Sequence, residues 1–137
     1  MVYNLDYHKK MVKKIILVED DSAIIDIYQT MIKKAGFDVE VISLGQEVLK
    51  RVKEVVAGEK PRPDMMLLDL ILPDMNGIEI LAEIRKNEAT KSIKVFILTN
   101  QEESGVATSD SVKPDKFIVK ANMTPTQLIE VIKQELA

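Results

Sequence analysis

Cysteine is absent from this chain of 137 residues, and histidine occurs once, as His8. The lack of cysteine excludes disulfides, thiolate metal sites and cysteine nucleophiles, and it is compatible with a reducing cytoplasm. A single histidine near the start of the chain argues against a histidine-based zinc site and against a serine–histidine hydrolase. Any chemistry must therefore come from carboxylates, lysines and hydroxyl groups.

Long apolar runs and a strong excess of positive charge are also missing. No run approaches the roughly 20 residues that cross a bilayer, and residues 1–10 lack the apolar centre of a signal peptide. The net charge of -3 offers no basic face to nucleic acid. We therefore expect a cytoplasmic protein without membrane insertion or direct nucleic-acid binding. The length fits one domain, residues 11–137, preceded by a mobile extension, residues 1–10.

Short apolar runs alternate with amphipathic stretches five times, which predicts a doubly wound α/β fold with a parallel sheet and helices on both faces. The strand-like runs are residues 14–18, 37–42, 64–68 and 93–98 and a last run that begins at Phe117. Helical spacing predicts helices that begin near Ser22, before Val48 and at Gly77. Asp21 or Ser22 is the expected cap of the first helix.

The final third of the chain contains one clear helix pattern and one weak one. The sequence Thr124-Pro-Thr-Gln127 predicts a capping box at the start of a last helix. Residues 101–116 have few apolar anchors, so a fourth helix there should be short or irregular. Arg85 and Lys86 are interpreted as solvated charges at the negative end of the third helix.

Acidic side chains follow two of the predicted strands directly. Glu19, Asp20 and Asp21 come after residues 14–18, and Asp69 comes after residues 64–68. The carboxyl ends of parallel strands form the ligand crevice of an open sheet, so these acids should converge there. Converging carboxylates repel one another, which predicts a bound cation. For Asp21 we favour helix capping over metal ligation.

Four sequence elements together resemble the receiver domain of bacterial response regulators. They are Glu19-Asp20-Asp21 after Leu-Val, the run from Met-Met-Leu-Leu-Asp69 to Gly77, Ile-Leu-Thr99, and Phe117-Ile-Val-Lys120. The resemblance covers almost all of residues 11–137. It implies a flavodoxin-like sheet of five strands in the order 2-1-3-4-5. It also implies a function as a phosphoacceptor in signalling.

The resemblance assigns roles to individual residues. Asp69 is implied as the phosphoacceptor, Asp20 as a direct metal ligand, Glu19 as a ligand through water, and Ile71 as a ligand through its backbone carbonyl. Such oxygen ligands suit Mg²⁺, and Mn²⁺ could replace it. Thr99 and Lys120 are implied to contact the phosphoryl group, and Thr99 with Phe117 to report phosphorylation by moving together.

The implied partners are a sensor histidine kinase or a histidine phosphotransfer protein, and an unknown downstream protein target. The implied activity is self-catalysed phosphorylation and dephosphorylation rather than metabolic catalysis. An alternative is an interaction module of the same fold that works without phosphorylation. A phosphatase of the haloacid-dehalogenase kind is less well supported, because it needs a second aspartate where Ile71 stands.

Three positions depart from the pattern of the family. Ala121 follows Lys120 where proline with a cis peptide is common, so the bond is either trans or a strained cis bond that costs about 3 kcal/mol. Asn100 follows Thr99 in place of a small residue and, with Ile71, is expected to slow hydrolysis of the phosphorylated state. Residues 104–116 lack a clear helix, which predicts unusual partners or a helix that orders on phosphorylation.

Overall fold

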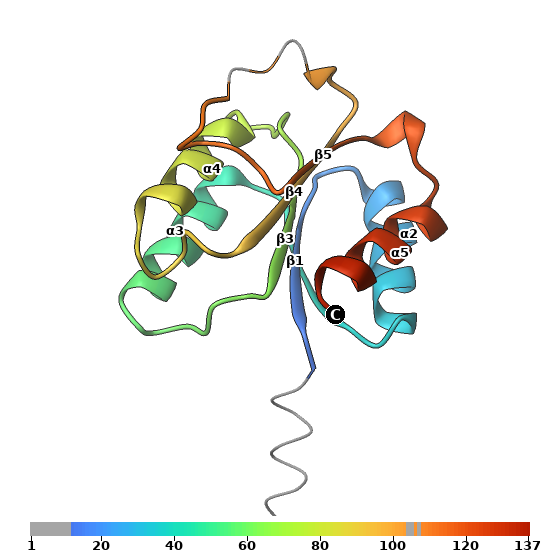
Figure 1. The fold of residues 1–137 in the computed structure, drawn as a ribbon, viewed down its shortest axis with the longest axis horizontal. Helices are drawn as coiled ribbons and strands as arrows, with labels where there is room; N and C mark the ends of the chain where they lie inside the picture. The colour runs from blue at the N-terminus through green and yellow to red at the C-terminus, as the bar shows by residue number, and fades with distance from the viewer. Residues whose placement is uncertain (1–11, 104–105, 107) are drawn as a thin grey trace, which may run out of the picture.

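The structure is a computed structural model that describes residues 12–103, 106 and 108–137; the predicted extension, residues 1–10, lies outside the described residues. Five parallel strands form one sheet in the order β2-β1-β3-β4-β5 (Figure 1). The strands are β1 (Lys14–Val18), β2 (Asp38–Ile42), β3 (Met65–Leu68), β4 (Lys94–Thr99) and β5 (Lys116–Val119). The predicted fold class and strand order are confirmed.

Helices cover both faces of the sheet, as the alternating pattern predicts. Helices α3 (Gly45–Val56) and α4 (Gly77–Lys86) lie on one face, and α2 (Ser22–Lys34) and α5 (Pro125–Glu135) on the other (Figure 1). Alternate residues of each strand therefore enter different cores. Ile16, Met66 and Ile97 pack beneath α3 and α4, whereas Leu17 and Leu67 pack beneath α2 and α5.

The strand register brings the acidic residues to one edge of the sheet. Val18 pairs with Leu68 in the parallel ladder between β1 and β3. Glu19 and Asp69 are the next residues along each strand, so both leave the sheet at the same level. All four residues of β3 are buried, and the apolar sequence Met-Met-Leu-Leu is what a strand covered on both faces requires.

Local capping fixes the ends of the helices around this edge. The side chain of Asp21 accepts hydrogen bonds from Ala23 N and Ile24 N, which confirms Asp21 as the cap of α2. The predicted capping box at Thr124 is present at the start of α5. The helices thus begin where the sequence predicts.

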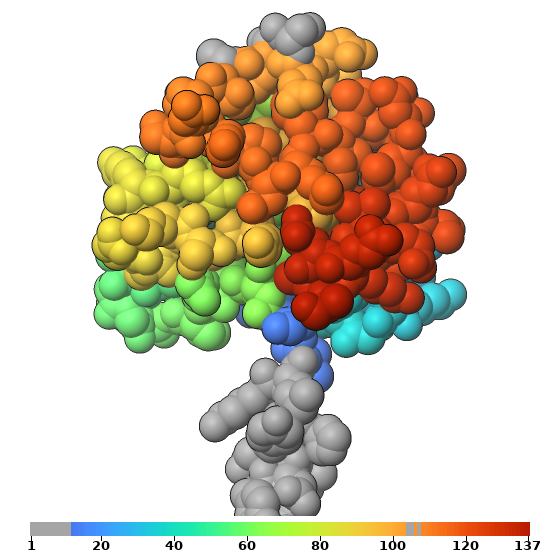
Figure 2. Space-filling view, viewed as in Figure 1, coloured from blue at the N-terminus to red at the C-terminus, as the bar shows by residue number. Residues whose placement is uncertain are grey.

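The connection between β4 and β5 contains no α-helix among its described residues. Ser109 and Val112 form an isolated antiparallel bridge, and Val106 and Val112 are partly buried against the core beneath α3 and α4. The expected fourth helix is accordingly replaced by irregular chain that still covers this face. Figure 2 shows this connection, in orange, as part of the outer surface.

Arg85 corrects one expectation, because its side chain is not a solvated charge but only 13% exposed. Its guanidinium donates hydrogen bonds to the carbonyl oxygens of Lys91, Ile93 and Lys113 and to Asp115. A planar guanidinium with five donors can satisfy several acceptors at once. Arg85 therefore fastens the chain before β4 and the chain before β5 to the end of α4.

None of the helices among the described residues is both long and apolar enough to cross a membrane.

Candidate functional site

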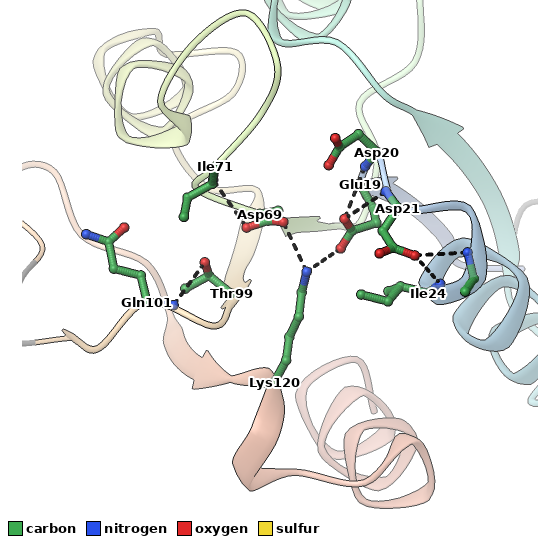
Figure 3. Close-up of polar contacts among 10 residues, drawn as sticks. Glu19, Asp20, Asp21, Ile24, Asp69, Ile71, Thr99, Gln101 and Lys120 are labelled. Atoms are coloured by element: carbon green, nitrogen blue, oxygen red, sulfur yellow. Dashed lines mark hydrogen bonds and ion pairs between the residues drawn. The ribbon is translucent and has the colours of Figure 1, made fainter.

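Three carboxylates meet at the carboxyl ends of β1 and β3. One oxygen from each of Glu19, Asp20 and Asp69 lies within 4.8 Å of the others. Glu19 is 2% exposed and Asp69 is 7% exposed, whereas Asp20 is open to solvent. The site is thus a buried acidic pair with an exposed third carboxylate at its rim (Figure 3).

Lys120 contacts both members of the buried pair. Its Nζ donates to Glu19 Oε1 at 2.5 Å and to Asp69 Oδ2 at 3.0 Å. Lys120 comes directly after β5 and begins a short 3-10 turn, Lys120–Asn122. No cis peptide bond occurs among the described residues, so the bond between Lys120 and Ala121 is trans. The departure at Ala121 is accommodated by this turn, and Lys120 still reaches the acids.

Burial and charge act in opposite directions on these groups. Burial raises the pKa of Glu19, and the hydrogen bond from Lys120 only partly offsets this effect. Burial also works to lower the pKa of Lys120, but the hydrogen bonds from it to Glu19 and Asp69 outweigh burial, and its pKa is raised. Lys120 therefore stays charged at neutral pH.

Backbone groups hold both buried carboxylates in place. Glu19 Oε2 accepts from Asp20 N at 3.1 Å and from Asp21 N at 3.2 Å. Asp69 Oδ1 accepts from Ile71 N at 3.2 Å. Each acid thus keeps one oxygen on the backbone and offers the other to Lys120 (Figure 3).

The loop after Asp69 is closed tightly by Gly77. Gly77 N donates to Leu70 O at 2.7 Å. A Cβ atom at position 77 would lie 2.5 Å from the carbonyl oxygen of Asp69 and 3.0 Å from Leu70 Cα, so only glycine fits. Ile71 lies at the start of this loop, pairs with Asn76 and is 63% exposed.

Thr99 and Phe117 occupy different parts of the site region. Thr99 ends β4 and is 1% exposed, and its Oγ1 accepts from Gln101 N at 3.4 Å. β4 pairs with β3, the strand that Asp69 follows, so Thr99 and Asp69 leave the sheet at the same edge (Figure 3). Phe117 is partly buried against the core beneath α3 and α4. The structure thus brings together Glu19, Asp20, Asp69 and Lys120. Thr99 ends the neighbouring strand β4, and Phe117 contacts the core rather than the acids.

Sequence reasoning missed Asp74, which lies in the loop after Asp69. Its two carboxylate oxygens accept from Gly45 N at 2.8 Å and from Gln46 N at 3.0 Å, at the start of α3. The pair Pro73-Asp74 is typical of a turn, and nothing in it indicates a partner 28 positions away. The one available signal is Leu44, the residue before α3, which has no side chain able to cap a helix.

The donor atoms at this site fit a hard divalent cation. Carboxylate and backbone carbonyl oxygens are the ligands that Mg²⁺ and Mn²⁺ prefer, and Mg²⁺ commonly binds through one or two carboxylates. The exposed position of Asp20 leaves an open approach for an ion that keeps several waters. The residues present are therefore consistent with a divalent cation site.

Comparisons with known proteins agree with this geometry. A family model, the response regulator receiver domain, matches residues 15–133. The DNA-binding response regulator MtrA of Mycolicibacterium paratuberculosis is 30% identical over 127 residues. That match covers 92% of this chain and 52% of MtrA, so the chain spans about half the length of this relative.

Two solved structures have the same fold. The phosphorylated cyanobacterial phytochrome response regulator RcpA is 31% identical, with a TM-score of 0.74 and coverage of 90% of each chain. The Mn²⁺-bound response regulator Rcp1 is 28% identical, with a TM-score of 0.73 and coverage of 89% of this chain and 90% of Rcp1. On the family match and this shared architecture, the chain belongs to the response regulator receiver family.

Proposed function

We propose that Asp69 accepts a phosphoryl group from a phosphohistidine on a sensor histidine kinase or a histidine phosphotransfer protein. The observation that carries this proposal is the position of Asp69, a buried carboxylate held between Lys120 and the backbone of its own loop. The acid is fixed in one orientation, with a cation 3.0 Å from the oxygen that faces Lys120. Such preorganisation is what phosphoryl transfer needs, because the protein contributes mainly positioning and charge.

The transfer is a substitution at phosphorus. An oxygen of Asp69 forms the new P–O bond, the P–N bond to the donor imidazole breaks, and the released ring nitrogen takes up a proton. Lys120 neutralises a phosphoryl oxygen while it remains close to Glu19. Thr99 accepts a hydrogen bond through its oxygen, which leaves its hydroxyl proton available for a second phosphoryl oxygen.

Glu19, Asp20, Asp69 and the carbonyl of Ile71 would hold Mg²⁺. The bound ion supplies positive charge that lowers the repulsion between the Asp69 carboxylate and the incoming phosphoryl group. Asp20, as the exposed member, is a direct ligand in this proposal. Glu19 acts through water, as the resemblance to receiver domains implies. Mn²⁺ can serve in its place, and the relative Rcp1 has been solved in a Mn²⁺-bound form.

Phosphorylation is proposed to act on the surface formed by β5, α5 and the connection before β5. Thr99 moves toward the phosphoryl group and Phe117 turns inward, which favours one of two arrangements of this surface. The chain then signals by contact with a downstream protein, and it also hydrolyses its own acyl phosphate. A Phe117 rotamer that is the same with and without a phosphoryl mimic would contradict this coupling.

Intact mass spectrometry with a small phosphoramidate donor and Mg²⁺ tests the central claim. The wild type should gain the mass of one phosphoryl group, and Asp69→Asn should gain none. Asp26→Asn is the matched control, because Asp26 is an exposed acid on α2 outside the site, and it should be labelled like the wild type. An unlabelled wild type, beside a labelled control receiver, would overturn the proposal.

The alternative function is a receiver-like module that acts without phosphorylation. The irregular connection between β4 and β5 favours it, since the described part of this connection has no α-helix to reposition. The same labelling experiment separates the two functions. Return of the phosphoryl group from Asp69 to a histidine phosphotransfer protein would further identify a relay rather than a terminal regulator.

A further inference from the structure

The loop between Asp69 and Gly77 is fastened at its base and again at its tip. The base is closed by the hydrogen bond from Gly77 N to Leu70 O, and Leu70 is fully buried. The tip is formed by residues 72–75, in which Leu72 N donates to Met75 O at 3.3 Å. Ile71 lies between base and tip, so the direction of its carbonyl depends on both.

Asp74 fastens the tip to a different element, helix α3. Its Oδ1 accepts from Gly45 N and its Oδ2 from Gln46 N. These N–H groups have no partner within the helix, and Leu44 provides no side-chain cap. The hydrogen bonds from Gln46 and Gly45 also lower the pKa of Asp74, which keeps the cap charged. Asp74 is thus the cap of a helix to which it does not belong.

The side chain of Met75 packs closely beside this cap. A Cβ atom at position 45 would lie 2.2 Å from Met75 Cγ and 2.6 Å from Met75 Sδ. Met75 therefore rests directly on the first turn of α3. The helix is in turn held against the sheet by the buried side chains of Val48 and Val52. The tip of the loop is consequently attached, through Asp74 and Met75, to a helix that packs on the sheet.

We propose that Asp74 is a positioning residue for the metal site: by holding the loop tip on α3, it sets the direction of the Ile71 carbonyl. This inference rests on the proposed function, in which that carbonyl is a metal ligand. Asp74 touches neither the ion nor the phosphoryl group, and it acts through Ile71. Groups that orient metal ligands typically change metal affinity by about 10-fold or more when removed.

The test is the affinity for Mg²⁺, measured by titration with MgCl₂ and amide chemical shifts, in Asp74→Ala and Asp74→Asn. We expect Asp74→Ala to bind Mg²⁺ about 10-fold more weakly than the wild type. Asp74→Asn should lie between them, because its amide keeps one acceptor oxygen for the two N–H groups. Amide exchange at Gly45 and Gln46 should become faster in the same order.

Two control variants separate positioning from stability and from charge. Asp64→Ala removes the acceptor of Lys14 N at the start of β1 and β3, the strand ends opposite the acidic site. It should lower Tm by about 4 °C, as we also expect for Asp74→Ala, without changing Mg²⁺ affinity. Glu47→Gln removes a negative charge from the first turn of α3 and leaves the cap intact. It should change Mg²⁺ affinity much less than Asp74→Ala.

The outcomes distinguish this inference from the proposed function. Equal Mg²⁺ affinity in Asp74→Ala and the wild type would overturn the positioning role and leave the proposed function standing. An equal loss of affinity in Glu47→Gln would also overturn it, because charge alone would then account for the effect. A wild type that neither binds Mg²⁺ nor accepts a phosphoryl group would overturn the proposed function itself.

Discussion

The acidic site and the connection between β4 and β5 lie in one domain but are held in place in different ways. At the site, Glu19 and Asp69 leave buried strands that are paired in register, and each carboxylate has both a backbone and a side-chain partner. Among its described residues, the connection is held by one isolated bridge, two partly buried valines and the guanidinium of Arg85. Strand pairing positions the site, whereas a few side chains position the connection.

This difference bears on where the domain can change shape. Segments with few buried contacts open at lower free energy than buried strands. A ligand at the site should therefore leave β1 and β3 unchanged and shift the balance of arrangements in the connection and β5. The predictions that follow test this division, beginning with the largest expected effect.

Replacement of Lys120 should have the largest effect, because it removes the only side-chain cation that the described residues place on Glu19 and Asp69. Lys120→Met leaves two buried carboxylates unbalanced, which should cost about 3 kcal/mol of unfolding free energy in EDTA. Loss of a preorganised positive charge should also slow phosphorylation about 100-fold. Thermal denaturation and intact mass spectrometry measure the two effects.

Mg²⁺ should raise the Tm of Lys120→Met more than that of the wild type, since the ion replaces part of the missing charge. Lys133→Met is the control, because the Lys133 side chain is 50% exposed and forms a long ion pair of 3.8 Å with Glu130. Lys133→Met should lower the unfolding free energy by less than about 0.5 kcal/mol. If Lys120→Met matched this control, the site would not depend on its internal ion pairs.

Replacement of Arg85 should loosen the connection and leave the site intact. Arg85→Ala leaves three carbonyl groups and Asp115 without this donor, which should cost about 2 kcal/mol. Amide exchange should become faster in residues 108–116, and the affinity for Mg²⁺ should stay within about twofold of the wild type. Lys86→Ala is the control, because the Lys86 side chain is 64% exposed. A large loss of Mg²⁺ affinity in Arg85→Ala would show that the two regions are not separate.

Glu40 lies on the edge strand β2, outside both the acidic site and the connection between β4 and β5, and serves as a reference for the effect of one ion pair on stability. Arg51 holds the pKa of Glu40 down to about 2 from an ordinary value of 4.5, with Lys14 adding to the effect. A depressed pKa stabilises the fold above pH 4.5, and this contribution is lost as the pH falls toward 2. The side chain is 31% exposed, so solvent screening limits the contribution to about 1 kcal/mol.

Chemical denaturation of Glu40→Gln and the wild type between pH 7 and pH 3 measures this contribution. The difference between the two should be about 1 kcal/mol at neutral pH and should narrow below pH 4.5. Glu59→Gln, a change at an exposed acid, should show no such trend. A difference that did not narrow at low pH would mean that the charge of Glu40 is not what stabilises this edge.

The smallest expected effect concerns Asn100, which is exposed and follows Thr99 at the end of β4. We expect the Asn100 side chain to restrict access of water to the acyl phosphate. The acyl phosphate of Asn100→Ala should therefore be hydrolysed a few-fold faster than that of the wild type, which corresponds to a decrease of less than about 1 kcal/mol in the activation free energy. The loss of phosphoryl mass with time measures the rate. A rate in Asn100→Ala no faster than in the wild type would reject the role of Asn100.

The site could be predicted from the sequence because its residues directly follow apolar strand patterns. Glu19, Asp20 and Asp69 needed only the rule that parallel strands end at one edge of the sheet. The contacts of Arg85 with Asp115 and of Asp74 with Gln46 could not be predicted, since these partners lie on other elements 30 and 28 positions away. A charged residue at a helix end or in a turn is usually solvated, so pattern alone gives no sign of such contacts.

The peptide after Lys120 shows a second limit of the sequence. The sequence alone does not decide between a cis and a trans peptide bond from Lys120 to Ala121. The 3-10 turn from Lys120 to Asn122 allows a trans bond while the Lys120 ammonium still contacts Glu19 and Asp69. That turn depends on the position of β5 in the sheet, which is a property of the whole fold. The boundary between residues 1–10 and the domain remains a prediction.

The ion pair between Lys120 and Glu19 joins positions 101 residues apart. During synthesis the nascent chain emerges from its N-terminus, so Glu19, Asp69 and Thr99 are made before Lys120. The site therefore completes only when the last strand has joined the sheet. A chain that has been synthesised only up to Thr99 lacks Lys120 and therefore has an incomplete acceptor site. Efficient phosphorylation should then begin only after the whole domain has folded.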